Sequence, residues 1–231
     1  MEKILTLLRR SATLEAEAPD AETFGAECLR EMKRLVAEAD ARLVRCIVNV
    51  ADAAAKEGTL DPKRPPPAYD AVVESWWNAT VDSAEPLLVA MARLAGACYS
   101  YRVHEVVQKD YVRNWTVGER SPGIKGIYTV NRRSELTRDA FAKHWHERHG
   151  PLAVKHHVGL SKYVQNVSLG PLDSGAPDFD GFATLHFPTA QDMRERFYDS
   201  PEGKKRIGED VARFIGSPSM QMNCSEYVLR G

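Results

Sequence analysis

Apolar residues recur along this chain in two patterns, short runs typical of strands and the spacing typical of helices, and the two patterns follow one another in each half. Residues 4–10 and 127–133 are short apolar runs rich in β-forming residues that end in an arginine pair, which predicts two strands. Apolar residues at helical spacing follow each run and predict an amphipathic helix. These helix residues are Phe24, Cys28, Met32, Leu35 and Val36 in the first half, and Phe141, Trp145, His149 and Leu152 in the second.

The later elements repeat in the same order. A numbering difference of 117 maps Phe24 onto Phe141, and it also maps Asn49 onto Asn166 in the next predicted strand. A third strand, a second helix and a last strand complete each half, and the last strand carries a glutamate in both. The predicted segments are 69–73, 83–94 and 98–107 with Glu105, and 179–183, 190–197 and 221–229 with Glu226.

Each half therefore follows the order β-α-β-β-α-β, the ferredoxin-like unit. A four-stranded sheet with helices on one face leaves its other face apolar, and two such sheets packed face to face bury both. We predict an α+β fold in which two tandem units, residues 1–108 and 123–231, form a pseudo-dimeric α+β barrel. Residues 51–68, which contain four prolines, and the linker 109–121 break the repeat and are expected to be loops.

Composition narrows the possible partners. The 231 residues include 31 Lys and Arg against 32 Asp and Glu, a balance that argues against a nucleic-acid or anionic-membrane binder. No run approaches the roughly 20 apolar residues of a membrane span, and the first residues do not form a signal peptide. The four cysteines have no metal-binding or disulfide-type spacing and are expected to be core residues in a reducing compartment. We expect a cytoplasmic protein that acts on a small molecule, with pairing of two chains left open.

Six of the seven histidines lie between residues 144 and 186, and three of them fall in one predicted helix. Trp145 and His149 share the buried face of this helix with Phe141, at steps of four. His144 and His146 are expected to point to solvent. The Gly-Pro pair at 150–151 is expected to stop or sharply kink the helix, because the residue before a proline avoids the α region.

His149 is the main candidate for chemistry on this helix. At the equivalent step the first half carries Met32, an ordinary core residue. His149 is therefore either a functional imidazole or a core histidine with a satisfied hydrogen bond. A metal site is not expected, because His146 lies on another face and His156 is two helical turns away, roughly 10 Å. Nucleotide-binding and serine-hydrolase motifs are absent from the sequence.

The second half resembles the EthD family of the dimeric α+β barrel superfamily. The resemblance rests on three stretches: Phe141-x3-Trp145-x3-His149-Gly150-Pro151-Leu152, Tyr163-Val164-Gln165-Asn166, and Phe179-Asp180-Gly181. The first half departs from the motif, since Cys28 stands for the tryptophan, Met32 for the histidine, and no Gly-Pro pair follows. The resemblance thus implies one competent half and one structural half in a single chain.

The resemblance also implies a range of activities. Relatives include cofactor-free dehydratases and decarboxylases of aromatic or polyketide-like compounds, monooxygenases of similar substrates, and haem-handling barrels. In the superfamily the ligand usually lies between helices and sheet. Carried over to this chain, His149 would lie on the helical wall, with Trp145 and Phe141 as substrate contacts. The sheet side would be lined by Tyr128 or Thr129, Tyr163 or Gln165, and His186.

Our leading hypothesis is a cofactor-independent lyase, a decarboxylase or dehydratase, that acts on a phenolic or polyketide-like molecule with no metal. His149 would be its general acid and base, because imidazole both takes and gives a proton near neutral pH. Tyr128 would donate a hydrogen bond to an oxyanion, Arg133 would hold a substrate carboxylate, and Asn131 would contact the substrate. Arg9 and Arg10 repeat the arginine pair in the first half, which favours a structural role for Arg132 and Arg133. The alternatives are a haem module with His149 as axial ligand, a cofactor-free monooxygenase and a non-catalytic carrier.

Overall fold

The computed structural model describes residues 1–11, 20–59, 68–216 and 220–231. The four prolines of the first predicted loop, at 62 and 65–67, lie outside these residues. The first half contains β1 (Glu2–Arg9), α1 (Ala21–Glu38), β2 (Leu43–Val50), α2 (Ala53–Lys56), β3 (Ala71–Trp77), the 3-10 turn η1 (Val81–Ala84), α3 (Glu85–Leu94) and β4 (Ala97–Lys109). The second half contains β5 (Ile124–Val130), α4 (Arg138–His144), the π-helical turn η2 (Trp145–His149), α5 (Gly150–His156), β6 (Lys162–Pro171), β7 (Gly181–Phe187), α6 (Ala190–Glu195), α7 (Pro201–Phe214) and β8 (Gln221–Arg230).

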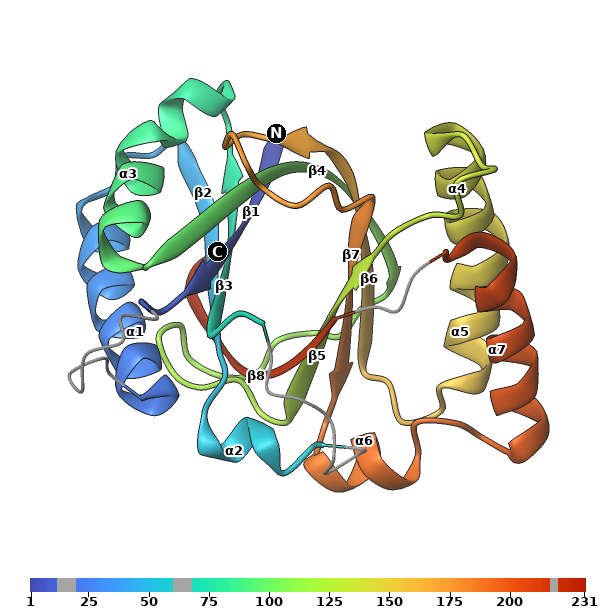
Figure 1. The fold of residues 1–231 in the computed structure, drawn as a ribbon. Coiled ribbons are helices and arrows are strands. Elements are labelled where there is room, and N and C mark those ends of the chain that lie inside the picture. Colours follow the sequence, from blue (N-terminus) through green and yellow to red (C-terminus); the bar gives the residue numbers. More distant parts are fainter. Residues whose placement is uncertain (12–19, 60–67, 217–219) are drawn as a thin grey trace.

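The eight strands close into one antiparallel barrel in the order β1-β3-β2-β8-β5-β7-β6-β4 (Figure 1). Each half contributes its strands in the ferredoxin-like order, fourth-first-third-second. The halves meet at two seams, where β2 pairs with β8 and β4 pairs with β6. The predicted pseudo-dimeric α+β barrel is therefore confirmed.

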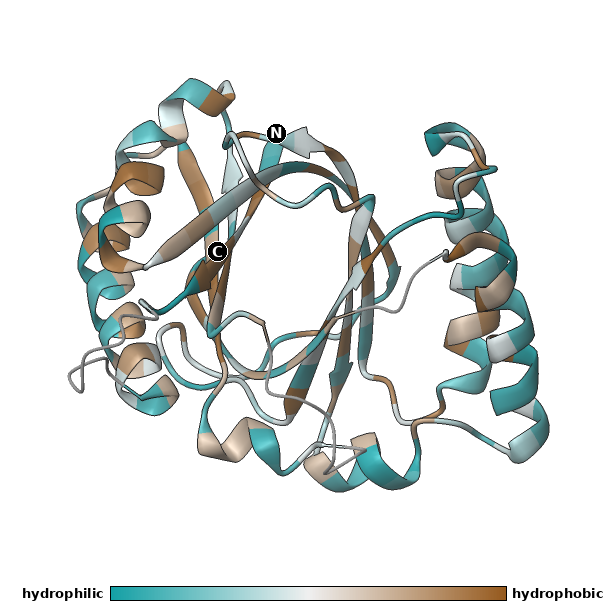
Figure 2. Cartoon of the chain, in the orientation of Figure 1, coloured by the Kyte–Doolittle hydropathy of each residue, from teal (hydrophilic) through white to brown (hydrophobic). Residues whose placement is uncertain are grey.

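Helices cover the outer face of the barrel on two opposite sides (Figure 1). Those of the first half, α1 and α3, pack on one side, and α4, α5 and α7 pack on the other. Figure 2 shows hydrophobic and hydrophilic residues alternating along α1 and α7, as expected of helices with one buried side. Among the described residues, no helix is long and apolar enough to cross a membrane.

The long helix α7 was not predicted, since the sequence analysis placed the second helix of this half at 190–197. That stretch forms only the short α6. The Ser200 side chain accepts the hydrogen bond of the Gly203 N–H and so caps α7, and Pro201 occupies its first turn. Ile207 and Phe214 form its buried side. Its buried positions 203, 207, 210 and 214 recur at helical spacing, but only two of these four residues are large and apolar.

The repeat in the first strands is displaced by one residue from the predicted match. The backbone N–H of Arg10 donates to Asp70 at 2.9 Å, and that of Arg132 donates to Asp180 at 2.9 Å. Arg10 therefore corresponds to Arg132, where the sequence match paired Arg10 with Arg133. Since strand side chains alternate, a slip of one residue exchanges the two faces of a strand. In the corrected register Lys3 and Lys125 are equivalent, and both point into the barrel.

Candidate functional site

The helix that carries the His-Gly-Pro sequence does not stop at Gly150, whose φ and ψ are helical, so the expectation that the residue before this proline avoids the α region is wrong. It passes through a π-helical turn, in which the Gly150 N–H donates to the Trp145 carbonyl five residues earlier, and continues as α5. Pro151 has no N–H to give to the next carbonyl in this register, that of His146. The side chain of Gln108 replaces it and donates to that carbonyl at 3.0 Å. π-Helical turns are rare and frequently occur at functional sites.

A glutamine pair from β4 and β6 holds this turn. Gln108 also donates to Gln165 Oε1 at 3.0 Å, and Gln165 Nε2 donates to the Trp145 carbonyl at 2.9 Å. His146 Nδ1 lies 2.6 Å from Gln165 Oε1, and its ring stacks on Trp145, so the expectation that His146 points to solvent is wrong. A Cβ at Gly150 would lie 2.3 Å from the Gln108 side chain, which explains the glycine.

His149 is held by a carboxylate from α7. Its Nδ1 lies 2.9 Å from Asp210 Oδ2, and His144 Nε2 lies 3.0 Å from Asp210 Oδ1. Both rings pack against Phe214, with centroids 5.0 and 4.9 Å away, so the solvent-facing prediction for His144 is also wrong. Because a carboxylate accepts at Nδ1, the basic nitrogen of a neutral His149 is Nε2. Burial raises the pKa of Asp210, but its contacts with the two histidines outweigh this and keep the pKa below its usual value.

An aromatic layer fills the space between this helix and the sheet. Phe141, Trp145 and Tyr163 are each at most 2% exposed, and Trp145 Nε1 donates to the Tyr163 hydroxyl at 3.1 Å. Burial raises the pKa of Tyr163 to about 12, so this phenol stays protonated. Tyr128 packs against the same cluster from the helix-facing side of β5. The structure therefore brings these four predicted residues together on one face of the sheet.

Asn131 and Arg133 lie at the C-terminal end of α7. The Asn131 carbonyl accepts the Gly216 N–H at 3.0 Å. Arg133 is exposed, with its guanidinium 2.8 Å from Glu135 and 3.2 Å from the Ala212 carbonyl. Arg132, in contrast, pairs with Asp180 as Arg10 pairs with Asp70, which explains why an arginine recurs there.

His186 does not share this layer, although the resemblance placed it there. Side chains alternate along β7, so Leu185 and Phe187 face the helices and His186 faces the barrel interior. Its Nε2 lies 3.1 Å from Glu226 Oε2. Burial lowers the pKa of His186, more strongly than the Glu226 carboxylate raises it, so the imidazole is neutral at physiological pH.

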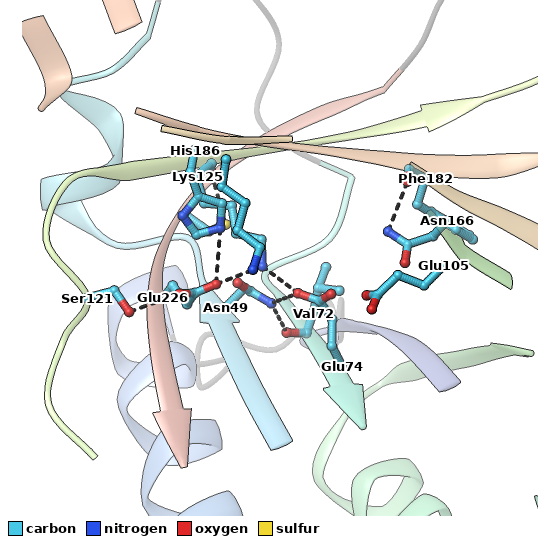
Figure 3. A network of polar contacts seen from close by, with 12 residues as sticks. Asn49, Val72, Glu74, Glu105, Ser121, Lys125, Asn166, Phe182, His186 and Glu226 are labelled. Atoms are coloured by element: carbon cyan, nitrogen blue, oxygen red, sulfur yellow. Dashed lines mark hydrogen bonds and ion pairs between the residues drawn. The ribbon is translucent and has the colours of Figure 1, made fainter. Parts of the chain in front are cut away.

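The barrel interior contains a buried ion cluster that the sequence analysis did not recognise (Figure 3). Glu74 pairs with both Lys3 and Lys125, and Lys125 also pairs with Glu226 at 2.9 Å. Lys3 pairs in turn with Glu105 at 2.5 Å. The signal in the sequence was a lysine within each otherwise apolar first strand, together with the repeated glutamates. The neighbouring lysines hold the pKa of Glu74 well below its usual value despite its burial.

The described residues around His149 do not fit a haem. Phe214 packs on its imidazole, and Phe141 contacts both Trp145 and Phe214, with centroids 5.4 and 5.9 Å apart, so these rings leave no space for a porphyrin between them. The His149 side chain is 9% exposed.

The closed eight-stranded barrel built from two equivalent halves defines the class, the dimeric α+β barrel proteins. The chain is similar over 99% of its length to an anthrone oxidase-like protein, with 11% identity, 93% of that chain covered and a TM-score of 0.62. It is also similar to a putative monooxygenase from Fusobacterium nucleatum subsp. nucleatum ATCC 25586, with 9% identity, coverage of 99% and 92%, and a TM-score of 0.54. A dye-decolorizing peroxidase from Bacteroides thetaiotaomicron VPI-5482 has 8% identity, coverage of 98% and 93%, and a TM-score of 0.55.

A family model matches part of the second half of the sequence. Residues 133–218 match the EthD domain, so the C-terminal half contains an EthD domain. This match includes both His149 and Asp210. No curated protein matches the chain. At identities this low the structural similarities establish the fold and not the reaction.

Proposed function

We propose that the protein is an enzyme that moves protons on a phenolic or polyketide-like small molecule, with His149 as acid and base and Asp210 as the residue that orients it. One observation carries this proposal: the His–Asp pair is complete in one half and absent from the other. Met32 stands where the repeat pairs a residue with His149, and α3 has no carboxylate from Pro86 to Leu94. A core that only needed packing would accept methionine at this step, as the first half does.

The leading reaction is that of a cofactor-independent lyase. In a dehydration, His149 Nε2 takes a proton from the carbon beside a carbonyl, and the conjugated ring delocalises the developing charge. The imidazolium then returns the proton to the departing hydroxyl, so that water leaves and the imidazole is neutral again. In a decarboxylation, the imidazolium protonates the ring carbon that carries the carboxylate, and CO2 leaves as the bond electrons return to the ring.

The other predicted residues have supporting roles in this proposal. Trp145, Phe141 and Tyr163 pack against one another, so they would contact the aromatic part of the substrate only after this layer opens, and Tyr128 would donate a hydrogen bond to its oxyanion. Arg133, with Asn131 beside it, would hold a substrate carboxylate at the surface, with its guanidinium exchanging Glu135 for the ligand. His186 faces the opposite side of the sheet and has no part in this proposal.

The second candidate is a cofactor-free monooxygenase. It is favoured by the names of two structural neighbours, which describe an anthrone oxidase-like protein and a putative monooxygenase. As in the dehydration, His149 would first take a proton, here that of the phenol, which makes the ring electron-rich enough to react with dioxygen. The two candidates differ in their products: a lyase releases water or CO2, and an oxygenase consumes dioxygen.

The test is a panel of phenolic acids and polyketide-type ketones, followed by mass spectrometry and an oxygen electrode. His149→Met installs the residue of the first half at this step, so the core stays filled, and we expect turnover to fall by about 10²–10⁴-fold. The turnover of Asp210→Asn should also fall. His144→Gln is the matched control, because His144 contacts the same carboxylate, and its turnover should stay within a few-fold. A His149→Met protein with full activity removes His149 from the mechanism.

Haemin addition separates the haem alternative. The proposed enzyme should leave the visible spectrum of haemin unchanged. A Soret band that appears on titration and is lost in His149→Met would replace the acid–base proposal by axial ligation.

A further inference from the structure

One end of the barrel contains a phenol supplied by the chain itself. Tyr111, in the linker after β4, lies with its ring 5.6 Å from the His186 ring and with Lys162 Nζ 5.2 Å above it. Its hydroxyl points at Glu226 Oε1 across 3.4 Å, and the Ser121 hydroxyl donates to the same oxygen at 2.9 Å. Tyr111 thus occupies a site with an aromatic wall, a cation above and a carboxylate at its base.

The first half has the same walls. Trp76 lies opposite Lys3 and Arg45 in the β-sheet register, as His186 lies opposite Lys125 and Lys162. Trp76 Nε1 donates to Glu105 at 3.3 Å, as His186 contacts Glu226. The equivalent pairs are Lys3 with Lys125, Arg45 with Lys162, Trp76 with His186, and Glu105 with Glu226.

Trp76 and His186 lie on opposite walls at the same end of the barrel, and the two walls differ in what covers them. Over Trp76 there is no ring corresponding to Tyr111 among the described residues; the Arg45 guanidinium lies there instead, 4.7 Å from the indole centroid. Within the part of the chain that the structure describes, Arg45 makes no hydrogen bond or ion pair. The Glu105 side chain is 23% exposed, whereas that of Glu226 is 4% exposed. A cavity of about 30 Å³ lies between the two walls. It is lined by Arg45, Trp76, Glu105 and Val107 on the first-half side and by Lys162, His186 and Glu226 on the other.

We propose that the first-half wall of this cavity binds a neutral phenolic molecule in the position equivalent to that of Tyr111. The ring would lie on Trp76 with Arg45 displaced to cover its other face, and the hydroxyl would donate to Glu105. Offset stacking on an indole and a guanidinium above the ring are both favourable contacts for a phenol. The hydroxyl gains a charge-assisted hydrogen bond to a carboxylate. The site is separate from that of His149, because it lies on the other face of the sheet, and it does not depend on the proposed reaction.

Binding is measured directly with 4-fluorophenol as the probe, by fluorine NMR titration of the full chain. We expect saturable binding at one site. Glu105→Gln replaces the charged acceptor by a neutral amide and should weaken binding about tenfold. Glu226→Gln is the matched control, the same change on the wall that Tyr111 already covers, and should leave this affinity within about twofold. Val107→Trp, at a residue 46% exposed, fills the cavity without touching a charge and should abolish binding.

Removal of the internal phenol provides the second test. Tyr111→Ala should open the equivalent site, so that the stoichiometry rises from one probe to two, and Glu105→Gln added to it should weaken only one of the two. Absence of saturable binding overturns the proposal, as does equal weakening by both glutamine variants. A stoichiometry that stays at one after Tyr111→Ala rejects the equivalence of the two walls. Should Glu105→Gln fail to fold, Val107→Trp is the deciding variant: loss of probe binding supports the proposed site, and unchanged binding overturns it.

Discussion

The two halves of the barrel share their framework and differ in their ionisable side chains. Asp70 and Asp180 tie equivalent strand ends, and Asn49 and Asn166 each donate to a carbonyl of the neighbouring strand, at 3.0 and 3.1 Å. The two halves can therefore be compared position by position. A residue present in both halves maintains the architecture, and one present in a single half has another reason to be there.

By this rule the side chains at the His149 and His186 sites differ from the core residues around them, because they occur in one half only. His149 and Asp210 have no ionisable counterparts in the first half, and His186 corresponds to Trp76. The Lys–Glu pairs inside the barrel, in contrast, are doubled, which favours a structural role for the pairs themselves. The exception is Glu74, which bridges both lysines and whose counterpart by register is Thr184.

The largest effect is expected from that exception. Glu74→Gln removes the carboxylate that the buried ammonium groups of Lys3 and Lys125 share, so we expect the free energy of unfolding to fall by about 3–5 kcal/mol. Thr184→Ser at the equivalent position should cost only about 1 kcal/mol. Urea denaturation of both variants measures the difference. Equal costs would mean that the ion cluster does not depend on the shared carboxylate.

A smaller effect concerns the loss of stability at acid pH, which we expect to depend on His157 in the second half. Burial lowers the pKa of His157 to about 4, and the hydrogen bond to the Phe197 carbonyl does not offset this. The unfolded chain binds a proton below pH about 6.5 and the folded protein only below about 4, so stability is lost as pH falls through this window, by about 3 kcal/mol in total. His157→Asn, which keeps a donor for the carbonyl, should flatten the profile. An unchanged slope in denaturation curves from pH 7 to 4 would assign the loss to other groups.

The smallest effect concerns the π-helical turn, which has no counterpart in α1. Gly150→Ala forces the Gln108 side chain away and removes its hydrogen bonds to the His146 carbonyl and to Gln165, at a cost of about 1–2 kcal/mol. Gln108→Ala removes the same bonds. The double variant should therefore cost less than the sum of the single ones. Strict additivity in thermal or urea unfolding would show that Gly150 is needed for another reason.

A feature of this protein could be predicted from the sequence where it depends on neighbouring residues, and it was missed where it depends on residues far apart in the chain. The helix with Phe141 was predictable because its buried face leaves a period in the sequence. The strand predicted at 179–183 lies at 181–187, where both faces are buried and no such period marks its bounds. The repeated glutamates at 105 and 226 were recognised as equivalent, but their lysine partners come from other strands and were missed. The direction of His186 was misjudged for a related reason: which face of a strand meets the helices is set by the packing of both halves.

The amino-acid order alone was enough to define two ferredoxin-like halves, their pairing into a barrel, and the half in which a histidine replaces a core methionine. These features depend on local periods and on a repeat, which can be read along the chain. The pairing of His149 with Asp210, the π-helical turn held by Gln108, and the lysine–glutamate cluster arise only when strands and helices distant in sequence come into contact. Hydrogen bonds and ion pairs act over about 3 Å, so their partners are selected by the folded arrangement and not by spacing in the chain.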